Sequence, residues 1–545
     1  MFKRNYLILA FIVLLALVLR FWQLDSNPPS LTWDEAAWGY NAYSLGIDGR
    51  DEFGKFLPIE YLESFGDFKP PLYAYLSVVP VWIFGLNEFS TRFISAFFGV
   101  LTVLVSYFLV KRIFPESDHK ESYALLTALF LAISPWHIML SRAAFEANVA
   151  SFFIVSGVWL FLGGVQDRKW FLVPSAVCFA LSFYTFNSAR VVVPLLVAVL
   201  VFASLKKLRK NLLPVSLAFI IGLVMVLPLV PFLLSPQAGL RFKEVNIFTD
   251  PTIVETANRQ IENDNNAIWS KVIHNRRIGY ALSYADHYFD NFNPTFLFIK
   301  GDGNPKFSTQ AVGQMYLWDL PFLILGAILL FRRREGFWWL VPTWILIGII
   351  PAGMARETPH ALRIETVLPL FQLLVAYGIV QLFFILKPVR SVNRYLIPFA
   401  GVLGALLFIN LVYFLHGYYA HYARIYSGEW QYGYKQSIEY ADLNKNKYDK
   451  IYVTEHLGRP YIYYLFYTKT DPAVFRSNSD VNRDAFGFVE VNRFSDYIFY
   501  EKPPKVTAGE KSLVISAYED VPPGKEVLKT FNLLNGESEL AAYEL

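Results

Sequence analysis

Long apolar segments recur along most of this chain, and they constrain its fold more than any other feature. Of its 545 residues, 54% are hydrophobic and only 17% are charged, whereas a soluble protein carries about 25% charged residues. Apolar runs of about 17–25 residues are long enough to cross the hydrocarbon layer of a bilayer. The sequence therefore predicts a polytopic α-helical membrane protein.

Eleven segments are predicted to span the membrane. They are Tyr6–Leu24, Phe89–Phe114, Tyr123–Leu140, Asn148–Val165, Trp170–Phe186, Val191–Leu205, Leu212–Leu234, Tyr316–Phe331, Phe337–Met354, Ile364–Leu386 and Tyr395–His416. A further apolar stretch, Leu72–Gly85, is short and contains Pro80. Whether it spans decides the side of the membrane on which every later loop lies.

The basic loops settle this topology. If Lys3 and Arg4 lie in the cytoplasm and Leu72–Gly85 does not span, every strongly basic short loop falls on the cytoplasmic side, as the positive-inside rule requires. These loops contain Lys111-Arg112, Arg168-Lys169, Lys206–Lys210, Arg332–Arg334 and Lys387–Arg394. We therefore expect Leu72–Gly85 to be a juxtamembrane helix, and the N-terminus to face the cytoplasm from a plasma (inner) membrane.

On this topology two loops, residues 25–87 and 235–315, and the polar tail face outward. We divide the chain into a membrane domain, 1–416, and an extracytoplasmic domain, 417–545. The single cysteine, Cys178, lies within an apolar segment, so no disulfide framework is expected.

The tail carries signals of a small α/β domain. Strand-like runs occur at Lys450–Thr454 and Ser512–Ala517, and a helical pattern occurs near Tyr434–Leu443. Turn residues separate these segments, as they do in mixed folds.

Two adjacent carboxylates, Asp34 and Glu35, follow the first predicted span, and Lys69-Pro70-Pro71 precedes the juxtamembrane helix. The acidic pair opens a predicted helix, Asp34–Leu45, with Thr32 as its N-cap. Acids favour a helix N-terminus for electrostatic reasons alone, and a lysine can snorkel at an interface. The functional interpretation is that a carboxylate acts as general base for a hydroxyl and the ammonium holds a lipid phosphate.

Glu146 lies on the same predicted side of the membrane, near Arg142. A structural ion pair with Arg142 and a catalytic or acceptor-binding role are both compatible with this position.

Four cations run against the positive-inside trend. Arg190 lies on one outward turn, and Arg356, His360 and Arg363 lie on another. A bound anion would explain them, and so would snorkelling.

The loop 235–315 has two further features. Ile268, Trp269, Val272, Ile273 and Ile278 form an amphipathic pattern that can lie on a membrane. The run 301–304, Gly-Asp-Gly-Asn, favours a tight turn over a metal site because it has too few carboxylates for a calcium loop.

Three motifs together resemble a known family. Thr32-Trp33-Asp34-Glu35, Lys69-Pro70-Pro71-Leu72-Tyr73 and Glu88-Phe89-Ser90-Thr91-Arg92 are similar to glycosyltransferase family 39, which includes the protein O-mannosyltransferases, and to the related lipid A aminoarabinose transferases. The resemblance covers about residues 1–416. It implies a GT-C fold and a polyprenyl-phosphate sugar donor.

The resemblance also implies residue roles. Asp34 matches the catalytic aspartate, Lys69 the lysine that contacts the donor phosphate, and Glu146 the acidic residue of the second outer loop. Arg363 matches an arginine before a late span. The aminoarabinose transferases have an arginine where Ala37 stands and a glutamate where Phe68 stands, which argues against lipid A as acceptor.

We therefore expect a membrane glycosyltransferase that moves a monosaccharide from a polyprenyl phosphate to an extracytoplasmic hydroxyl of a protein, lipid or glycan, with inversion. The candidate catalytic residues are Asp34, Glu35 and Glu146, and the candidate phosphate-binding residues are Lys69, Arg190, Arg356, His360 and Arg363. No cofactor is required, although Glu35 and Glu146 are compatible with a divalent metal.

The main alternative is a transporter or flippase of an anionic lipid-linked substrate, which would show broken helices and charges at mid-membrane. The net charge of +4 is too small to indicate a nucleic-acid partner.

Overall fold

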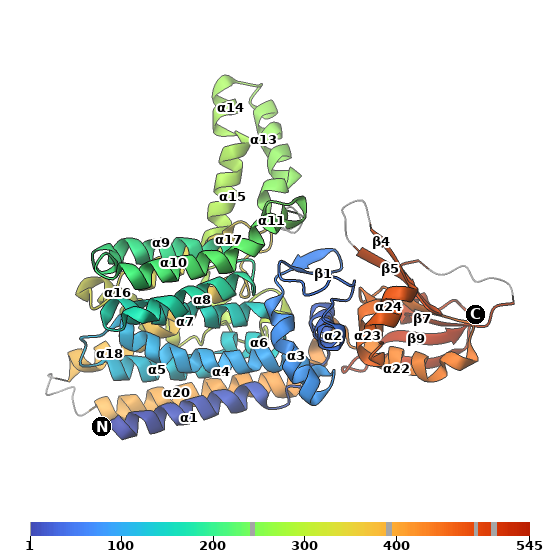
Figure 1. The fold of residues 1–545 in the computed structure, drawn as a ribbon, viewed down its shortest axis with the longest axis horizontal. Helices are drawn as coiled ribbons and strands as arrows, with labels where there is room; N and C mark the ends of the chain where they lie inside the picture. Colours follow the sequence, from blue (N-terminus) through green and yellow to red (C-terminus); the bar gives the residue numbers. More distant parts are fainter. Residues whose placement is uncertain (1, 240–245, 388–394, 484–488, 503–508) are drawn as a thin grey trace. The chain divides into compact units, whose positions relative to one another are not determined.

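The computed structural model describes residues 2–239, 246–387, 395–483, 489–502 and 509–545 (Figure 1). The chain separates into two compact units. The first, here the helical unit, comprises Met1–Ala16, Gly99–Met139 and Ala147–Val412. The second, here the mixed unit, comprises Leu17–Phe98, Leu140–Glu146 and Tyr413–Leu545.

Apolar helices make up most of the helical unit, and five of them have residues in both units, namely α1 (Phe2–Phe21), α4 (Glu88–Ile113), α6 (Pro135–Arg142), α7 (Glu146–Gln166) and α20 (Leu396–His416). The other larger helices are α5 (Lys120–Ile133), α8 (Leu172–Phe183), α9 (Ala189–Leu208), α10 (Leu212–Val226), α16 (Asp319–Arg333), α17 (Leu340–Gly353) and α18 (Leu370–Leu386).

Every predicted span contains a helix, but some of these helices are shorter than the predicted spans. Among the described residues, seven helical stretches are long and apolar enough to cross a membrane, or eight if α5 and α6, bent by 55°, form one span. Helix α3 (Leu72–Phe84) has 13 residues, which is too short to cross the hydrocarbon layer. The predicted polytopic α-helical fold is confirmed, with an approximate number of spans.

Close helix contacts hold this unit together. A Cβ atom added at Gly326 of α16 would lie 1.9 Å from the Leu374 carbonyl oxygen of α18. Small residues let helix backbones approach in this way within membranes. In the predicted basic loop Lys387–Arg394, Arg390 and Arg394 lie outside the described residues.

Between residues 246 and 318 the helical unit carries a helical hairpin. It consists of α13 (Pro251–Asn263), α14 (Ile268–Ile273) and α15 (Arg276–Asp290), which we call the arm. The arm begins after a short bridge in which Asn246 pairs with Ala355.

The N-terminal part of the mixed unit is built from α2 (Trp33–Asp48), the hairpin β1 (Leu62–Ser64) and β2 (Asp67–Lys69), and α3. Strands β1 and β2 are antiparallel, with Leu62 opposite Lys69.

The tail contributes a seven-stranded sheet of order β4-β5-β6-β3-β7-β9-β8. The strands are β3 (Lys450–Thr454), β4 (Ser479–Arg483), β5 (Val489–Phe494), β6 (Tyr497–Tyr500), β7 (Ser512–Ala517), β8 (Val527–Asn532) and β9 (Ser538–Glu544), and the helices are α22 (Tyr434–Asn444), α23 (Pro460–Thr468) and α24 (Pro472–Asn478). Strand β3 is parallel to both β6 and β7. The predicted α/β tail is confirmed, and β3 and β7 coincide with the two predicted strands.

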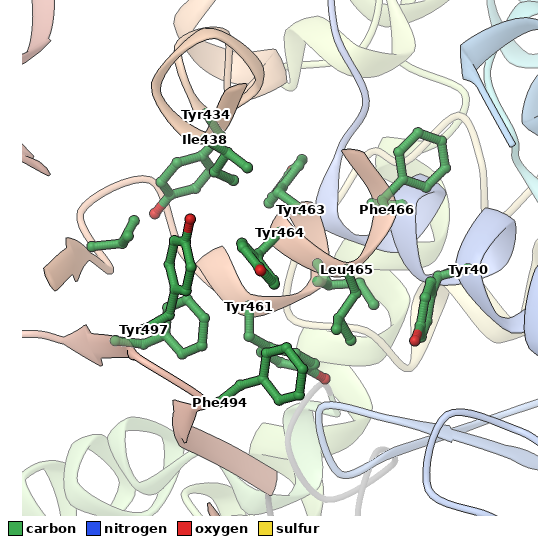
Figure 2. Packing of buried hydrophobic residues seen from close by; sticks show 14 of the residues in the cluster. Tyr40, Tyr434, Ile438, Tyr461, Tyr463, Tyr464, Leu465, Phe466, Phe494 and Tyr497 are labelled. Carbon is green, nitrogen blue, oxygen red and sulfur yellow. The ribbon is translucent and has the colours of Figure 1, made fainter. Parts of the chain in front are cut away.

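An aromatic core joins α2 to the tail. Tyr461, Tyr463, Tyr464 and Phe466 of α23 are buried in it (Figure 2). The Tyr463 hydroxyl donates to the Leu31 carbonyl oxygen over 3.0 Å. Helix α2 therefore depends for its position on residues more than 400 positions later in the chain.

Candidate active site

Helix α2 begins with a capping box. Thr32, the predicted N-cap, accepts a hydrogen bond from the Glu35 amide over 3.2 Å, and the Glu35 carboxylate accepts one from the Thr32 amide over 3.0 Å. Two backbone donors that a helix N-terminus leaves free are satisfied in this way. Asp34 lies in the same first turn, where its side chain is 53% exposed and the helix dipole favours its negative charge.

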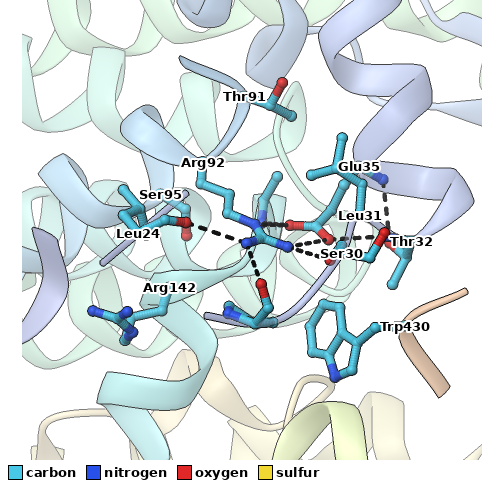
Figure 3. A network of polar contacts seen from close by, with 12 residues as sticks. Leu24, Ser30, Leu31, Thr32, Glu35, Thr91, Arg92, Ser95, Arg142 and Trp430 are labelled. Carbon is cyan, nitrogen blue, oxygen red and sulfur yellow. Dashed lines mark hydrogen bonds and ion pairs between the residues drawn. The ribbon is translucent and has the colours of Figure 1, made fainter. Parts of the chain in front are cut away.

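Glu35 is the centre of a buried ionic network (Figure 3). Its carboxylate pairs with the Arg92 guanidinium, 2.9 Å from Nε, and accepts the Ala144 amide over 2.9 Å. Both side chains of this pair are almost completely buried. Since both of its oxygens are bound by protein groups, the geometry gives Glu35 a positioning role.

The other guanidinium nitrogens of Arg92 bind backbone carbonyl groups. They donate to the carbonyl oxygens of Leu24, Pro28 and Ser30. One guanidinium thereby fixes the segment that leads from the first helix to α2.

Lys69 lies at the end of β2, where it meets α2. Its ammonium pairs with the Asp34 carboxylate, and it lies 5.3 Å from the Trp38 ring centre and 5.4 Å from that of Phe65. The Lys69 side chain is only 10% exposed. The pair thus joins a shielded cation to a carboxylate that solvent or a ligand can reach.

Glu146 is drawn into the same cluster. It opens α7, and the charges of Lys69, Asp34 and Asp67 act on its carboxyl group. Asp34 and Lys69 pair directly, and Glu146 lies within electrostatic range of both.

The alternative ion pair between Glu146 and Arg142 is not formed among the described residues. The Arg142 guanidinium instead donates to the Tyr418 hydroxyl and to the carbonyl oxygens of Leu19, Gln23 and Asn27. These neutral acceptors use all of its nitrogens.

Glu52 is a buried acid that the sequence did not single out. It is completely buried, and one carboxyl oxygen accepts the Ser64 hydroxyl over 2.7 Å. The Glu52 amide donates to the Asn41 side chain of α2 over 3.0 Å. Burial raises the pKa of Glu52 to about 8, although Ser64 and Lys69 act in the opposite direction. Glu52 links α2 to the hairpin that carries Lys69, and its burial favours the protonated form.

The four other predicted cations belong to the helical unit. Arg190 donates to the Phe183 carbonyl oxygen over 3.2 Å and lies 5.7 Å from the Phe232 ring centre. Arg356 donates to the Asn246 carbonyl oxygen over 3.0 Å and to the Thr249 hydroxyl over 3.1 Å.

Arg363 and His360 lie on the turn that follows Arg356. Arg363 donates to the Glu357 carbonyl oxygen over 3.1 Å. Burial, helped by the charge of Arg363, lowers the pKa of His360 well below its usual range. His360 is therefore a neutral imidazole.

Asp302 anchors this turn, and sequence reasoning missed that role. Its carboxylate accepts the Ala361 amide over 2.7 Å and the Asn304 amide over 2.8 Å, the second contact closing the predicted tight turn. Burial raises the pKa of Asp302 to about 6. Within the described residues, no three His, Cys, Asp or Glu side chains are grouped closely enough to hold a metal ion.

The apolar helices and the sheet of the tail define an integral membrane protein with an α/β domain. The fold is similar to that of ArnT from Cupriavidus metallidurans, both in the apo state and bound to undecaprenyl phosphate. Each comparison has a TM-score of 0.53 and covers 98% of this chain and 97% of that chain, with 14% and 13% sequence identity respectively.

Within this class, residues 10–239 match the family described as dolichyl-phosphate-mannose-protein mannosyltransferase. The resemblance to glycosyltransferase family 39 is thereby confirmed over residues 10–239, which are less than half of the chain. An uncharacterized protein of Aquifex aeolicus (strain VF5) is 30% identical over 222 residues, which are 40% of this chain and 40% of that relative.

Replacing Glu35 by Gln should destabilise the mixed unit. Glutamine keeps the shape but leaves the buried Arg92 guanidinium without a charged partner, and breaking a buried ion pair costs about 3–5 kcal/mol. Thermal unfolding in detergent should give a clearly lower midpoint for Glu35→Gln than for Asp34→Asn, whose side chain is half-exposed. Equal midpoints for the two variants would contradict the positioning role of Glu35.

Replacing Glu52 by Gln should change how stability depends on pH. Because the folded pKa of Glu52 is raised to about 8, the unfolded chain loses this proton first as pH rises. Stability should therefore fall between about pH 5 and pH 8 in the parent protein. Unfolding midpoints across this range should fall less steeply in Glu52→Gln, and parallel curves would show that Glu52 does not contribute.

Proposed function

We propose that this protein is a membrane glycosyltransferase that moves a monosaccharide from a polyprenyl phosphate to a hydroxyl acceptor. The observation that carries the proposal is the pairing of a half-exposed Asp34 carboxylate with the shielded Lys69 ammonium. The match of residues 10–239 to a mannosyltransferase family supports it. So does the fold of a protein solved with undecaprenyl phosphate.

In the proposed reaction Asp34 accepts the proton of the acceptor hydroxyl. That oxygen forms a bond to the anomeric carbon while the bond from this carbon to the lipid phosphate oxygen breaks. A single displacement of this kind inverts the anomeric configuration. Charge on the departing phosphate is stabilised by the Lys69 ammonium.

The pair of Asp34 and Lys69 makes these two roles interdependent. Before the donor binds, the ammonium is engaged by the carboxylate. A donor phosphate that takes up the ammonium frees the carboxylate to accept a proton. Donor binding thus prepares the base.

Other charged groups take supporting roles in the proposal. Glu146, next to the pair, would orient the acceptor. Arg190, Arg356, His360 and Arg363, all in the helical unit, stay predicted phosphate-binding residues. No step requires a metal.

The proposed partners are a polyprenyl-phosphate sugar, an acceptor hydroxyl on a protein, lipid or glycan, and the lipids of the plasma (inner) membrane. The distribution of basic loops supports a cytoplasmic N-terminus. The same rule puts Asp34, Lys69 and the tail on the outer side.

A transporter of an anionic lipid is the second candidate. The 55° bend between α5 and α6 favours it, since transporters use broken helices. A labelled-product assay separates the two functions because only the transferase forms a new glycosidic bond.

Asp34→Asn should abolish transfer while the protein stays folded, because asparagine keeps the volume but cannot act as a base. Losing a general base costs about 10²–10⁴ in rate. The assay is transfer of radiolabel from a panel of polyprenyl-phosphate sugars in native membranes, with the unfolding midpoint as the control for folding. Near-normal transfer by this variant would refute the assigned base.

Lys69→Ala should weaken binding of undecaprenyl phosphate. A hydrogen bond to a charged group contributes about 1.5–3 kcal/mol, so a roughly tenfold to hundredfold loss of affinity is expected. Lys55→Ala is the matched control, because Lys55 belongs to the same loop and pairs with Glu60. If both variants bind the lipid phosphate as the parent does, Lys69 is not its ligand.

A further inference from the structure

We propose that the arm, α13–α15, lies in the interface of the bilayer with an apolar surface in contact with lipid. This inference does not depend on the proposed reaction. It rests on four observations: exposed apolar side chains, their alignment, their continuity with an apolar helix of the unit, and the direction of the arm.

The tip of the arm exposes large apolar side chains. In α14 the exposed fractions are 83% for Ile268, 56% for Trp269, 63% for Val272 and 55% for Ile273. A contiguous apolar patch of this kind is uncommon on a surface that faces water and indicates an interaction site.

The apolar surface continues along α15. Ile278, Leu282 and Phe289 are exposed, and their spacing of four and seven residues places them on one face of the helix. A stripe therefore runs from the tip of the arm toward its base.

The base of the arm packs against an apolar helix. The Tyr288 hydroxyl donates to the Leu346 carbonyl oxygen of α17 over 2.7 Å. Tyr284, Tyr288 and Phe289 line a shallow, open apolar hollow together with Leu346, Ile347 and Ile350. Helix α17 in turn contacts α9, which is long enough to span the membrane. The stripe thus continues toward helices that are long and apolar enough to span a membrane, and this continuity favours lipid over a protein as its occupant.

The direction of the arm fits this placement. The arm runs across the direction of α9 and α10 (Figure 1). Because those helices are long and apolar enough to cross the bilayer, an element that runs across them follows the membrane surface. Amphipathic helices in this position bury their apolar face about 5–10 Å deep.

The polar residues of the arm suit the same orientation. Glu255, Arg259 and Glu262 are exposed along α13 at spacings of four and three residues, so they share a face. Lys271, Arg276 and Arg277 lie beside the apolar tip and are exposed. Basic side chains at the membrane interface reach lipid headgroups while their aliphatic stems stay in the apolar zone.

The test uses single cysteines labelled with an environment-sensitive fluorophore in nanodiscs. The only native cysteine, Cys178, is first replaced by Ser. Labels are then placed by Trp269→Cys and Leu282→Cys on the apolar stripe, and by Glu262→Cys on the polar face as the matched control. Quenching by spin-labelled lipid is compared with quenching by aqueous iodide.

Lipid contact predicts roughly threefold stronger quenching by spin-labelled lipid at positions 269 and 282 than at 262, and the reverse order with iodide. Iodide quenching at 269 and 282 as strong as at 262 would overturn the proposal. Protection of 269 and 282 from both quenchers would also overturn it, since a protein partner would then cover the stripe. Two labelled positions keep the test valid if one substitution impairs folding.

Discussion

The buried ion pair between Arg92 and Glu35 is the interaction on which the site depends. A guanidinium taken out of water is costly unless its donors are all satisfied, and here one carboxylate and three backbone carbonyl groups satisfy them. The same carboxylate caps α2 and holds the amide of Ala144. Helix α2, the segment before it and the segment that leads to Glu146 are therefore fixed to one another through a single pair of charges.

The acidic groups around this pair are of two kinds. Some hold the backbone in position, and others are accessible to a ligand. Glu35 and Glu52 are buried and bonded within the protein, so they position α2 and the hairpin. Asp34 keeps half of its side chain exposed. The proposed base, Asp34, is thus the carboxylate that the structure leaves accessible, and its buried neighbours keep it in place. The tail adds to this support through α23, which packs against α2.

Much of the fold was predictable from sequence because a helix that spans a membrane needs a long apolar run, which composition and periodicity reveal. Apolar runs located the helices, and turn residues and apolar runs located β3 and β7. The N-cap at Thr32 followed from its residue type and its position before the acidic pair. The role of Glu35 could not be separated from that of Asp34 in this way, because adjacent acids look alike until their partners are known. Asp302 was missed for the same reason, since its partner, the Ala361 amide, is 59 residues away.

The sequence by itself determined that this is a polytopic helical membrane protein with an α/β tail, and it marked Asp34, Lys69 and Glu146 as candidates. Local patterns suffice there, because helix length, alternation and capping depend on neighbouring residues. Only the tertiary structure decided that Asp34 pairs with Lys69, that Arg92 rather than solvent meets Glu35, and that α23 supports α2. Those contacts join residues tens to hundreds of positions apart, and burial and pairing are properties of the folded chain alone.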